Sequence, residues 1–210
     1  MKITITKSKT IQWLSISSTI LSLLIGATTL ARGQRPFLDT FSIIGKRNKV
    51  LFALYGITTS IALGCNMVVA TNNTPYTNDK IQKIHKYIVY TAMSVSIITL
   101  LITTFVHGID PPDWDIKRQV HVAASMIFGI SGLILSVYLL ILNFIKNKSW
   151  QFSLIYLIAL VASAAYFLTK TIQLGWFTAI TQFIIIEVNI FALLCKNYLE
   201  PKWTNAPNNK

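Results

Sequence analysis

Residues 120 to 145 read VHVAASMIFGISGLILSVYLLILNFI and contain no Asp, Glu, Lys or Arg. The hydrocarbon core of a bilayer is about 30 Å thick, and a helix that rises about 1.5 Å per residue needs about 20 apolar residues to cross it. This stretch exceeds that length without a single full charge. It therefore predicts a helix that crosses a membrane.

Five further apolar runs flank this one, separated by short polar loops. Backbone groups in lipid find no water to bond, so a spanning segment is a helix or a strand of a closed barrel. Barrel strands alternate polar and apolar residues over about 10 positions, and these runs do not. We predict an all-α, polytopic membrane protein, a single domain over residues 1–210. Its six transmembrane helices form one bundle and span about residues 11–31, 50–70, 87–107, 120–145, 152–169 and 175–195.

The composition agrees with a chain that is dissolved largely in lipid. Hydrophobic residues make up 53% of it and charged residues only 12%, compared with about 25% charged residues in soluble domains. The net charge of +12 resides in loops and tails beside the apolar runs, where Lys and Arg attract anionic headgroups. We therefore expect membrane lipids, and not nucleic acid, as partners. Cys65 and Cys195 fall within apolar runs and predict no disulfide.

The distribution of Lys and Arg predicts the orientation. Lysines before the first run are also typical of a signal peptide, but this run is long for one and ends in the poor cleavage site TLA at residues 29–31. We therefore interpret it as an uncleaved first span. With six spans, eleven of the 19 Lys and Arg lie on the side of both termini and eight on the other. The positive-inside rule then favours cytoplasmic termini in a bacterial inner or plasma membrane.

Small residues recur at helical spacing within three of the runs. Such stripes let helix backbones approach closely, and close packing replaces the hydrophobic drive that lipid does not supply. We expect these stripes to pack within the bundle, and the alternative is contact between copies in a homo-oligomer. The stripes consist of Gly56, Ser60 and Gly64 in the second run, Ser125, Gly129, Gly132 and Ser136 in the fourth, and Ala159, Ala162, Ser163 and Ala165 in the fifth.

The first loop, RPFLDTFSIIG at residues 35–45, predicts a short helix. Pro36 suits a first helical position and Gly45 suits the residue after a helix end. Asp39 near the start complements the helix dipole. One apolar stripe on this helix consists of Phe37, Phe41 and Ile44. We predict that the helix lies in the membrane surface, either as a structural lid or as one wall of a headgroup pocket.

The third loop, residues 107–121, holds three of the seven acids and two of the three histidines of the chain. His107 ends the third run and His121 begins the fourth, so both lie at one membrane level, and His121 is expected to point into the bundle. A metal site there would use His107, Asp113 and His121, and acid–base chemistry would pair His121 with an aspartate. The simpler interpretation is a hydrogen bond from His121 to a neighbouring helix. We expect no metal, haem or other cofactor.

Glu187 follows three isoleucines in the middle of the sixth run. An ionised carboxylate at that depth costs at least about 2.5–3.5 kcal/mol on insertion scales, so it must be protonated, paired or beside a wet cavity. Gln182, Asn189 and Asn66 are the polar neighbours that the sequence offers. Glu187 is therefore either a structural hydrogen-bonding group or the centre of a proton-coupled activity.

Several short motifs resemble those of a known family. They are RPFLDTFSIIG at residues 35–45 followed by Phe52 and Gly56, DP at residues 110–111, and HVAA at residues 121–124 followed by Phe128. This pattern resembles the bacterial domain-of-unknown-function 998 family of six-helix membrane proteins. More distantly, it is similar to six-helix eukaryotic membrane proteins of the autophagy-modulator type. The resemblance implies six helices with both termini inside and no established chemistry, and its motifs pass through Ser42, Asp110 and His121.

Three functional hypotheses follow from these residues. The leading one is a protein of uncharacterised activity that binds a lipid headgroup or lipophilic ligand at its outer-face loops, through Arg35, Asp39, Ser42, His107, Asp110 and His121. The second is a membrane-embedded enzyme that acts on a lipid or isoprenoid, with the catalytic candidates His121, Asp110 and Glu187. The third is a small proton-coupled transporter built around Glu187. The sequence contains no lipid-phosphatase, intramembrane-protease, GxSxG or Walker motif, so no common membrane enzyme fits it.

Overall fold

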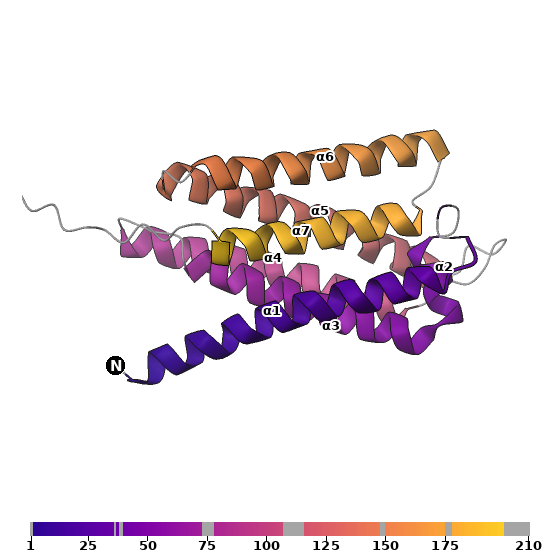
Figure 1. Ribbon diagram of the computed structural model, residues 1–210, viewed down its shortest axis with the longest axis horizontal. Coiled ribbons are helices and arrows are strands. Elements are labelled where there is room, and N and C mark those ends of the chain that lie inside the picture. Colours follow the sequence, from indigo (N-terminus) through magenta and orange to yellow (C-terminus); the bar gives the residue numbers. More distant parts are fainter. Residues whose placement is uncertain are drawn as a thin grey trace, which may run out of the picture.

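The computed structural model describes residues 2–35, 37, 40–72, 78–106, 116–147, 150–174 and 178–199. This part of the chain is helical and contains no strand, as the apolar runs predict. Six long helices run along a common direction, and one short helix lies between the first two (Figure 1). They are α1 (Lys2–Ala31), α2 (Phe41–Arg47), α3 (Lys49–Asn72), α4 (Asp79–Phe105), α5 (Ile116–Asn147), α6 (Trp150–Leu174) and α7 (Ala179–Leu199).

Five of these helices are long and apolar enough to cross a membrane. Their apolar segments are Lys9–Ala31 in α1, Lys49–Asn72 in α3, Asp79–Phe105 in α4, Gln119–Leu142 in α5 and Ala179–Tyr198 in α7. They agree with five of the predicted spans, although α4 begins at Asp79 and not near residue 87. Helix α6 has 25 residues, but the apolar segment described in it, Leu157–Lys170, is shorter than a full span. The sixth span stays a prediction.

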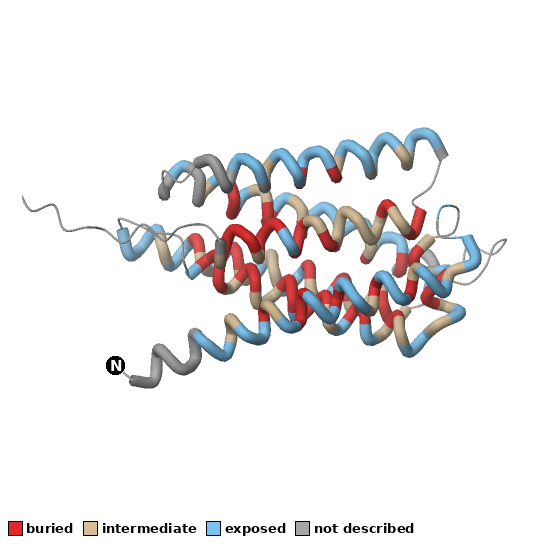
Figure 2. The backbone as a smooth tube through the Cα atoms, viewed as in Figure 1, coloured by how far each residue is buried: buried red, intermediate tan, exposed pale blue. Residues whose placement is uncertain are grey.

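The distribution of side chains is inverted relative to that of a soluble protein. Large apolar side chains point outward, and Ile130 and Ile158 are 61% and 58% exposed. Polar side chains are hidden, and Ser22, Thr59 and Asn66 have no exposed surface. Figure 2 shows α6 largely exposed and the buried residues concentrated on the facing sides of the other helices. Because lipid is as apolar as Ile, this arrangement is the one expected of helices packed in a membrane.

The main apolar core lies among α3, α4, α5 and α7. Leu63 and Met67 of α3, Leu139 of α5 and Leu193 of α7 belong to one cluster of buried side chains. Helix α6 joins the bundle through a separate cluster in which its Leu160 packs near Leu140 and Ala192. Cys65 and Cys195 are not bonded to each other, as expected.

The connections alternate between the two ends of the bundle. The first loop and the beginnings of α5 and α7 lie at one end, and the beginning of α1 and the end of α7 lie at the other (Figure 1). The first loop and His121 are therefore at one end, as the sequence predicts, and His85 near the start of α4 is at the other. This alternation brings the last residues of α1, the short helix α2 and the first residues of α3 together at one end of the bundle.

Helix α2 differs from the short helix that the sequence predicts. It begins at Phe41 and not at Pro36, and the Thr40 hydroxyl caps it by accepting a hydrogen bond from the Ile43 amide. Gly45 lies inside the helix and does not follow it. The ring of Phe52 rests against this glycine, where an added Cβ would lie 2.6 Å from ring carbons. The helix begins where Thr40 supplies a cap. Its placement in the membrane surface stays a prediction.

The predicted apolar stripe of this helix is divided between two surroundings. Phe41 and Ile44 are 4% and 0% exposed and pack with Phe52 and Tyr55 of α3. Phe37 lies outside the helix and is exposed. The buried side of α2 therefore faces the protein, because the aromatic rings of α3 and α7 offer it a closer apolar contact than lipid does.

The small-residue stripes have unequal roles. At Gly56 of α3 an added Cβ would overlap Thr104 of α4, so this glycine permits close helix packing. At Gly129 of α5 an added Cβ would meet nothing within 4 Å, so packing within the chain does not explain it. Ala159, Ala162 and Ala165 of α6 are exposed. The expected packing within the bundle holds for Gly56, and a contact between copies through α6 stays a prediction.

Candidate functional site

Glu187 lies at the centre of a buried polar contact between three helices. Its carboxyl oxygen Oε1 accepts a hydrogen bond of 2.8 Å from the Ser22 hydroxyl of α1. The Ser22 hydroxyl is also 2.8 Å from the Thr59 hydroxyl of α3. The Tyr55 hydroxyl faces the same carboxyl group at a geometry short of a full hydrogen bond. Glu187 is 7% exposed. These residues, Ser22, Tyr55, Thr59 and Glu187, form what we term the Glu187 centre.

A second polar cluster lies nearer the end of α7, in the same seam between α1, α3 and α7. Asn66 accepts a hydrogen bond of 2.9 Å from Ser15 and donates one of 3.1 Å to Thr19. Asn197 donates to the Asn66 backbone carbonyl at 2.8 Å. Asn66 has no exposed surface, so these bonds satisfy an amide that would otherwise be costly to bury.

The polar neighbours expected for Glu187 were wrong, because each of them bonds or points elsewhere. Asn66 belongs to the second cluster, and Gln182 accepts a hydrogen bond from the Phe41 amide of α2 at 3.1 Å. Asn189 lines a cavity toward α5. The residues of the Glu187 centre that the sequence did not predict are Ser22, Tyr55 and Thr59.

A signal for Ser22 was present in the sequence of α1. One stripe recurs at steps of four, three, four and three, and it consists of Ser15, Thr19, Ser22, Gly26 and Thr29. All five residues are buried against the bundle. A run of small and polar residues at this spacing indicates a helix face that packs closely and forms hydrogen bonds within a membrane.

The chemistry of the Glu187 centre follows from its surroundings. An ionised carboxylate accepts hydrogen bonds only, and the Ser22 hydroxyl supplies one donor. A protonated carboxyl group can also donate, which lets the same site exist without a buried charge. Because no buried Lys or Arg bonds to Glu187 among the described residues, the carboxyl group is suited to take up and release a proton.

A cationic hollow lies where α1, α2 and α3 meet at the end of the bundle. Its volume is about 390 Å³. We define it by its polar lining, which consists of Arg32, Lys46, Arg47, Asn48 and Lys49. Arg47 donates a hydrogen bond of 3.3 Å to Gln34. The basic residues gather because Asn48 alone separates the last turn of α2, whose dipole favours cations, from the first residue of α3.

The two sites are joined by an aromatic cluster. Phe41 at the start of α2 packs edge-on against Tyr55, with ring centroids 4.9 Å apart, and against Phe52 at 5.6 Å. Phe183 of α7 completes the cluster. Helix α2, which carries two cations of the hollow, therefore rests on the residue that faces Glu187.

The predicted site residues are only partly brought together. Arg35 is exposed and does not line the hollow. Ser42 lies in α2, but its side chain is outside the described part, as are Asp39, His107, Asp110 and Asp113. His121 is buried, as expected, and its Nδ1 lies 2.6 Å from the Val106 carbonyl oxygen at the end of α4. Among the described residues, no group of three His, Cys, Asp or Glu is placed to hold a metal.

Comparisons with protein-family models, with curated proteins and with solved structures found no match to this chain. We therefore infer what this chain does from the geometry of its own residues.

Proposed function

We propose that this chain is a membrane protein that binds the phosphate of an anionic lipid headgroup in the cationic hollow. The observation that carries the proposal is the convergence of four cations, from α2, from α3 and from the residue that follows α1, on one hollow at the end of the bundle. The apolar helices on one side of the hollow and its basic lining support a position at headgroup level.

The chemistry of the hollow matches a phosphate group. Arg side chains present several N–H donors in a planar fork, which binds phosphate oxygens in pairs, and Lys adds point charges. Each Lys or Arg near an anionic membrane surface contributes about 1 kcal/mol. The Asn48 amide, which also lines the hollow, adds hydrogen-bonding capacity that a simple charged flank lacks.

The bundle that carries the hollow has six spans in this proposal. Helix α6 runs beside α5 and α7 along the bundle (Figure 1). Many of its outward residues are apolar, and Ile155 and Ile172 are 59% and 81% exposed. An apolar surface of this kind supports a position of α6 in lipid. With α6 as a span, the hollow is on the face opposite both termini, which the positive-inside rule assigns to the outside.

The test compares two charge-removed proteins of equal net charge. In the hollow variant, Lys46, Arg47 and Lys49 are changed to Gln. In the control variant, Lys80, Lys83 and Lys86 at the other end of the bundle are changed to Gln. Each purified protein is placed in phosphatidylcholine bilayers with spin-labelled phosphatidylglycerol or phosphatidylcholine, and the fraction of immobilised label is measured by electron paramagnetic resonance.

We expect the native protein to prefer phosphatidylglycerol and the hollow variant to lose that preference. Three cations at about 1 kcal/mol each set a ceiling of roughly a hundredfold on the loss. The control variant should keep its preference within about twofold, since its lysines do not line the hollow. Equal losses in the two variants would show that the basic flanks act only as diffuse charge, and would refute a defined site.

A second candidate function is favoured by the Glu187 centre. A buried carboxyl group that bonds only to hydroxyl groups can carry a proton through the bundle, as in a proton-coupled transporter. Proton flux into dye-loaded proteoliposomes under a potassium diffusion potential tests it. Flux above that of empty liposomes, abolished by Glu187→Gln and retained by Asp79→Asn, would support it. Equal flux in native protein and Glu187→Gln would reject it.

The remaining hypotheses stay predictions. An enzyme that uses His121 needs an acid from the third loop, which lies outside the described residues. Membership of the domain-of-unknown-function 998 family rests on the short motifs alone.

A further inference from the structure

The cationic hollow is larger than one phosphate group requires. Its volume of about 390 Å³ equals that of about thirteen water molecules in the liquid, at about 30 Å³ each. A phosphate group by itself displaces roughly three such molecules. A lone phosphate therefore leaves most of the hollow to water, and a larger anionic group can contact more of its lining.

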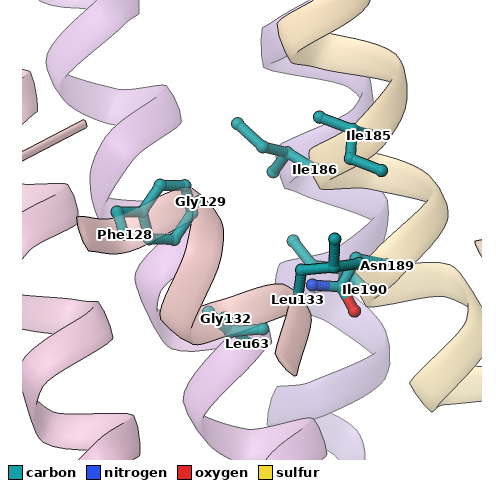
Figure 3. Close-up of a pocket in the computed structure, with 9 residues that line it drawn as sticks. All are labelled: Leu63, Phe128, Gly129, Gly132, Leu133, Ile185, Ile186, Asn189 and Ile190. Atoms are coloured by element: carbon teal, nitrogen blue, oxygen red, sulfur yellow. The ribbon is translucent and has the colours of Figure 1, made fainter. Parts of the chain in front are cut away.

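A second cavity, among α3, α5 and α7, lacks both the size and the charge for an anion. Its volume is about 30 Å³, which is the space of about one water molecule. Figure 3 shows Phe128 of α5 on one side of it and Ile186 of α7 on the other, with the Asn189 amide as the one polar side chain drawn. An anionic ligand is therefore expected in the hollow and not in this cavity.

Positive charge reaches the hollow from three successive segments of the chain. Arg32 directly follows α1, and Lys46 and Arg47 belong to the last turn of α2. Lys49 is the first residue of α3. Arg47 donates its hydrogen bond to Gln34 of the first loop, so its guanidinium group reaches from α2 toward the loop that also carries Arg32. No acid is among the residues that line the hollow within the described part of the chain.

The first turn of α3 adds a further preference for anions to the same lining. Residues 48 to 51 all line the hollow, and the Phe52 amide donates to the Asn48 carbonyl at 3.0 Å, which closes this turn. The first amides of a helix find no acceptor within it, and its positive dipole end favours phosphate. Lys46 and Arg47 offset the negative end of α2, while the positive end of α3 faces the hollow.

We propose that the headgroup bound in the hollow carries two phosphate groups. This inference rests on the proposed function and adds the number of phosphates to it. A single phosphodiester brings one negative charge to four converging cations and leaves much of their mutual repulsion in place. A second phosphate neutralises more of that charge. It also accepts charge-assisted hydrogen bonds from side chains that the first phosphate does not reach.

Two lipid chemistries supply a pair of phosphates. In the first, a glycerol bridge joins two phosphodiesters, as in cardiolipin. In the second, a lipid alcohol carries a diphosphate, whose two phosphorus atoms share one oxygen. The volume of the hollow, about 390 Å³, accommodates either group. The two differ in the distance between their phosphates, so their affinities distinguish them.

The test measures dissociation constants by native mass spectrometry of the purified protein, stripped of lipid in detergent. Cardiolipin is compared with phosphatidylglycerol, and geranylgeranyl diphosphate with geranylgeranyl monophosphate. We expect the two-phosphate lipid to bind at least about fivefold more tightly in one of these pairs, which corresponds to about 1 kcal/mol. The pair that shows the advantage identifies the chemistry. A smaller advantage in both pairs would overturn the inference.

A matched pair of variants separates the site from general charge. Arg32→Gln should lower the affinity for the preferred two-phosphate lipid about fivefold, the effect of one cation near a membrane surface. It should lower the affinity for phosphatidylglycerol less than about twofold, because a single phosphate still binds among the cations of α2 and α3. Arg35→Gln removes the same charge from an exposed side chain that does not line the hollow, and should leave both affinities within about twofold. Equal losses for the two lipids in Arg32→Gln would overturn the inference, as would equal losses in the two variants.

The same measurements distinguish this inference from the proposed function. If phosphatidylglycerol binds the native protein, loses affinity in the hollow variant, and is matched by both two-phosphate lipids, then the hollow holds one phosphate and only the inference fails. If the hollow variant binds every lipid as tightly as the native protein does, the proposed function fails with it.

Discussion

The sequence predicts the same close helix packing at Gly56 and Gly129, whereas the structure predicts opposite effects on stability when a side chain is added at each. Each belongs to a stripe of small residues in an apolar run. In the structure, the Cβ of Gly56→Ala would lie 2.5 Å from Thr104 Cγ2 and 2.8 Å from Thr104 Cβ, and still nearer to the Thr104 hydroxyl. The Cβ of Gly129→Ala would meet nothing within 4 Å. The same added methyl group therefore tests how closely helices α3 and α4 approach.

The expected magnitude follows from what Thr104 can do in response. It is 2% exposed and β-branched, and its hydroxyl donates a hydrogen bond of 2.8 Å to the Leu100 carbonyl. A β-branched side chain on a helix has few alternative rotamers, so α3 and α4 must separate. Overpacking of this kind costs about 1–3 kcal/mol, and replacing Gly by Ala within a helix returns up to about 1 kcal/mol. We expect a net loss of stability of up to about 2 kcal/mol for Gly56→Ala and a gain of up to about 1 kcal/mol for Gly129→Ala.

The assay is equilibrium unfolding in mixed micelles, in which the fraction of sodium dodecyl sulfate is raised and far-ultraviolet circular dichroism follows the helices. The two variants have identical composition, so differences in detergent binding by the unfolded chain cancel. If Gly56→Ala is as stable as Gly129→Ala, then α3 and α4 do not approach closely at Gly56, and the arrangement of these helices is wrong.

Substitutions at three further positions test the polar seam and α2 in the same assay. Asn66→Leu should lower the stability by about 2 kcal/mol, because it removes several buried hydrogen bonds. Each such bond contributes about 0.6–1 kcal/mol in a membrane bundle. A stability equal to that of the native protein would contradict the cluster around Asn66. Glu187→Gln should change the stability by less than about 1 kcal/mol, because an amide oxygen still accepts a hydrogen bond from Ser22. Glu187→Leu should lower the stability by about 1–3 kcal/mol, because it removes that acceptor. Equal losses in the two variants would argue against the hydrogen bond between Ser22 and Glu187. Phe41→Ala should lower the stability by about 3 kcal/mol, because it empties a buried aromatic position. It should also make the first loop more sensitive to protease. An unchanged cleavage rate would show that other contacts hold α2.

Much of the fold was predictable because lipid imposes a simple requirement on a chain. Long uncharged runs such as residues 120 to 145 form helices in a bilayer, since a single segment satisfies its own backbone groups there only as a helix. The alternation of loops between two ends follows from the order of these runs. The bounds of α2 were less predictable, because its start depends on the Thr40 cap and the position of Gly45 depends on the Phe52 ring of another helix.

The functional residues also divide into those that the sequence predicted and those that only the structure placed. Apolar runs, basic loops, the isolated acid at position 187 and the place of His121 at the start of an apolar run are properties of consecutive residues, and the sequence alone determined them. The partners of Glu187, the convergence of Arg32 with Lys46 and Lys49, and the cavity beside Asn189 were decided only by the tertiary structure. The physical reason is that a helix period specifies which residues share a face, whereas the rotation of that face against another helix depends on side-chain packing summed over the whole bundle.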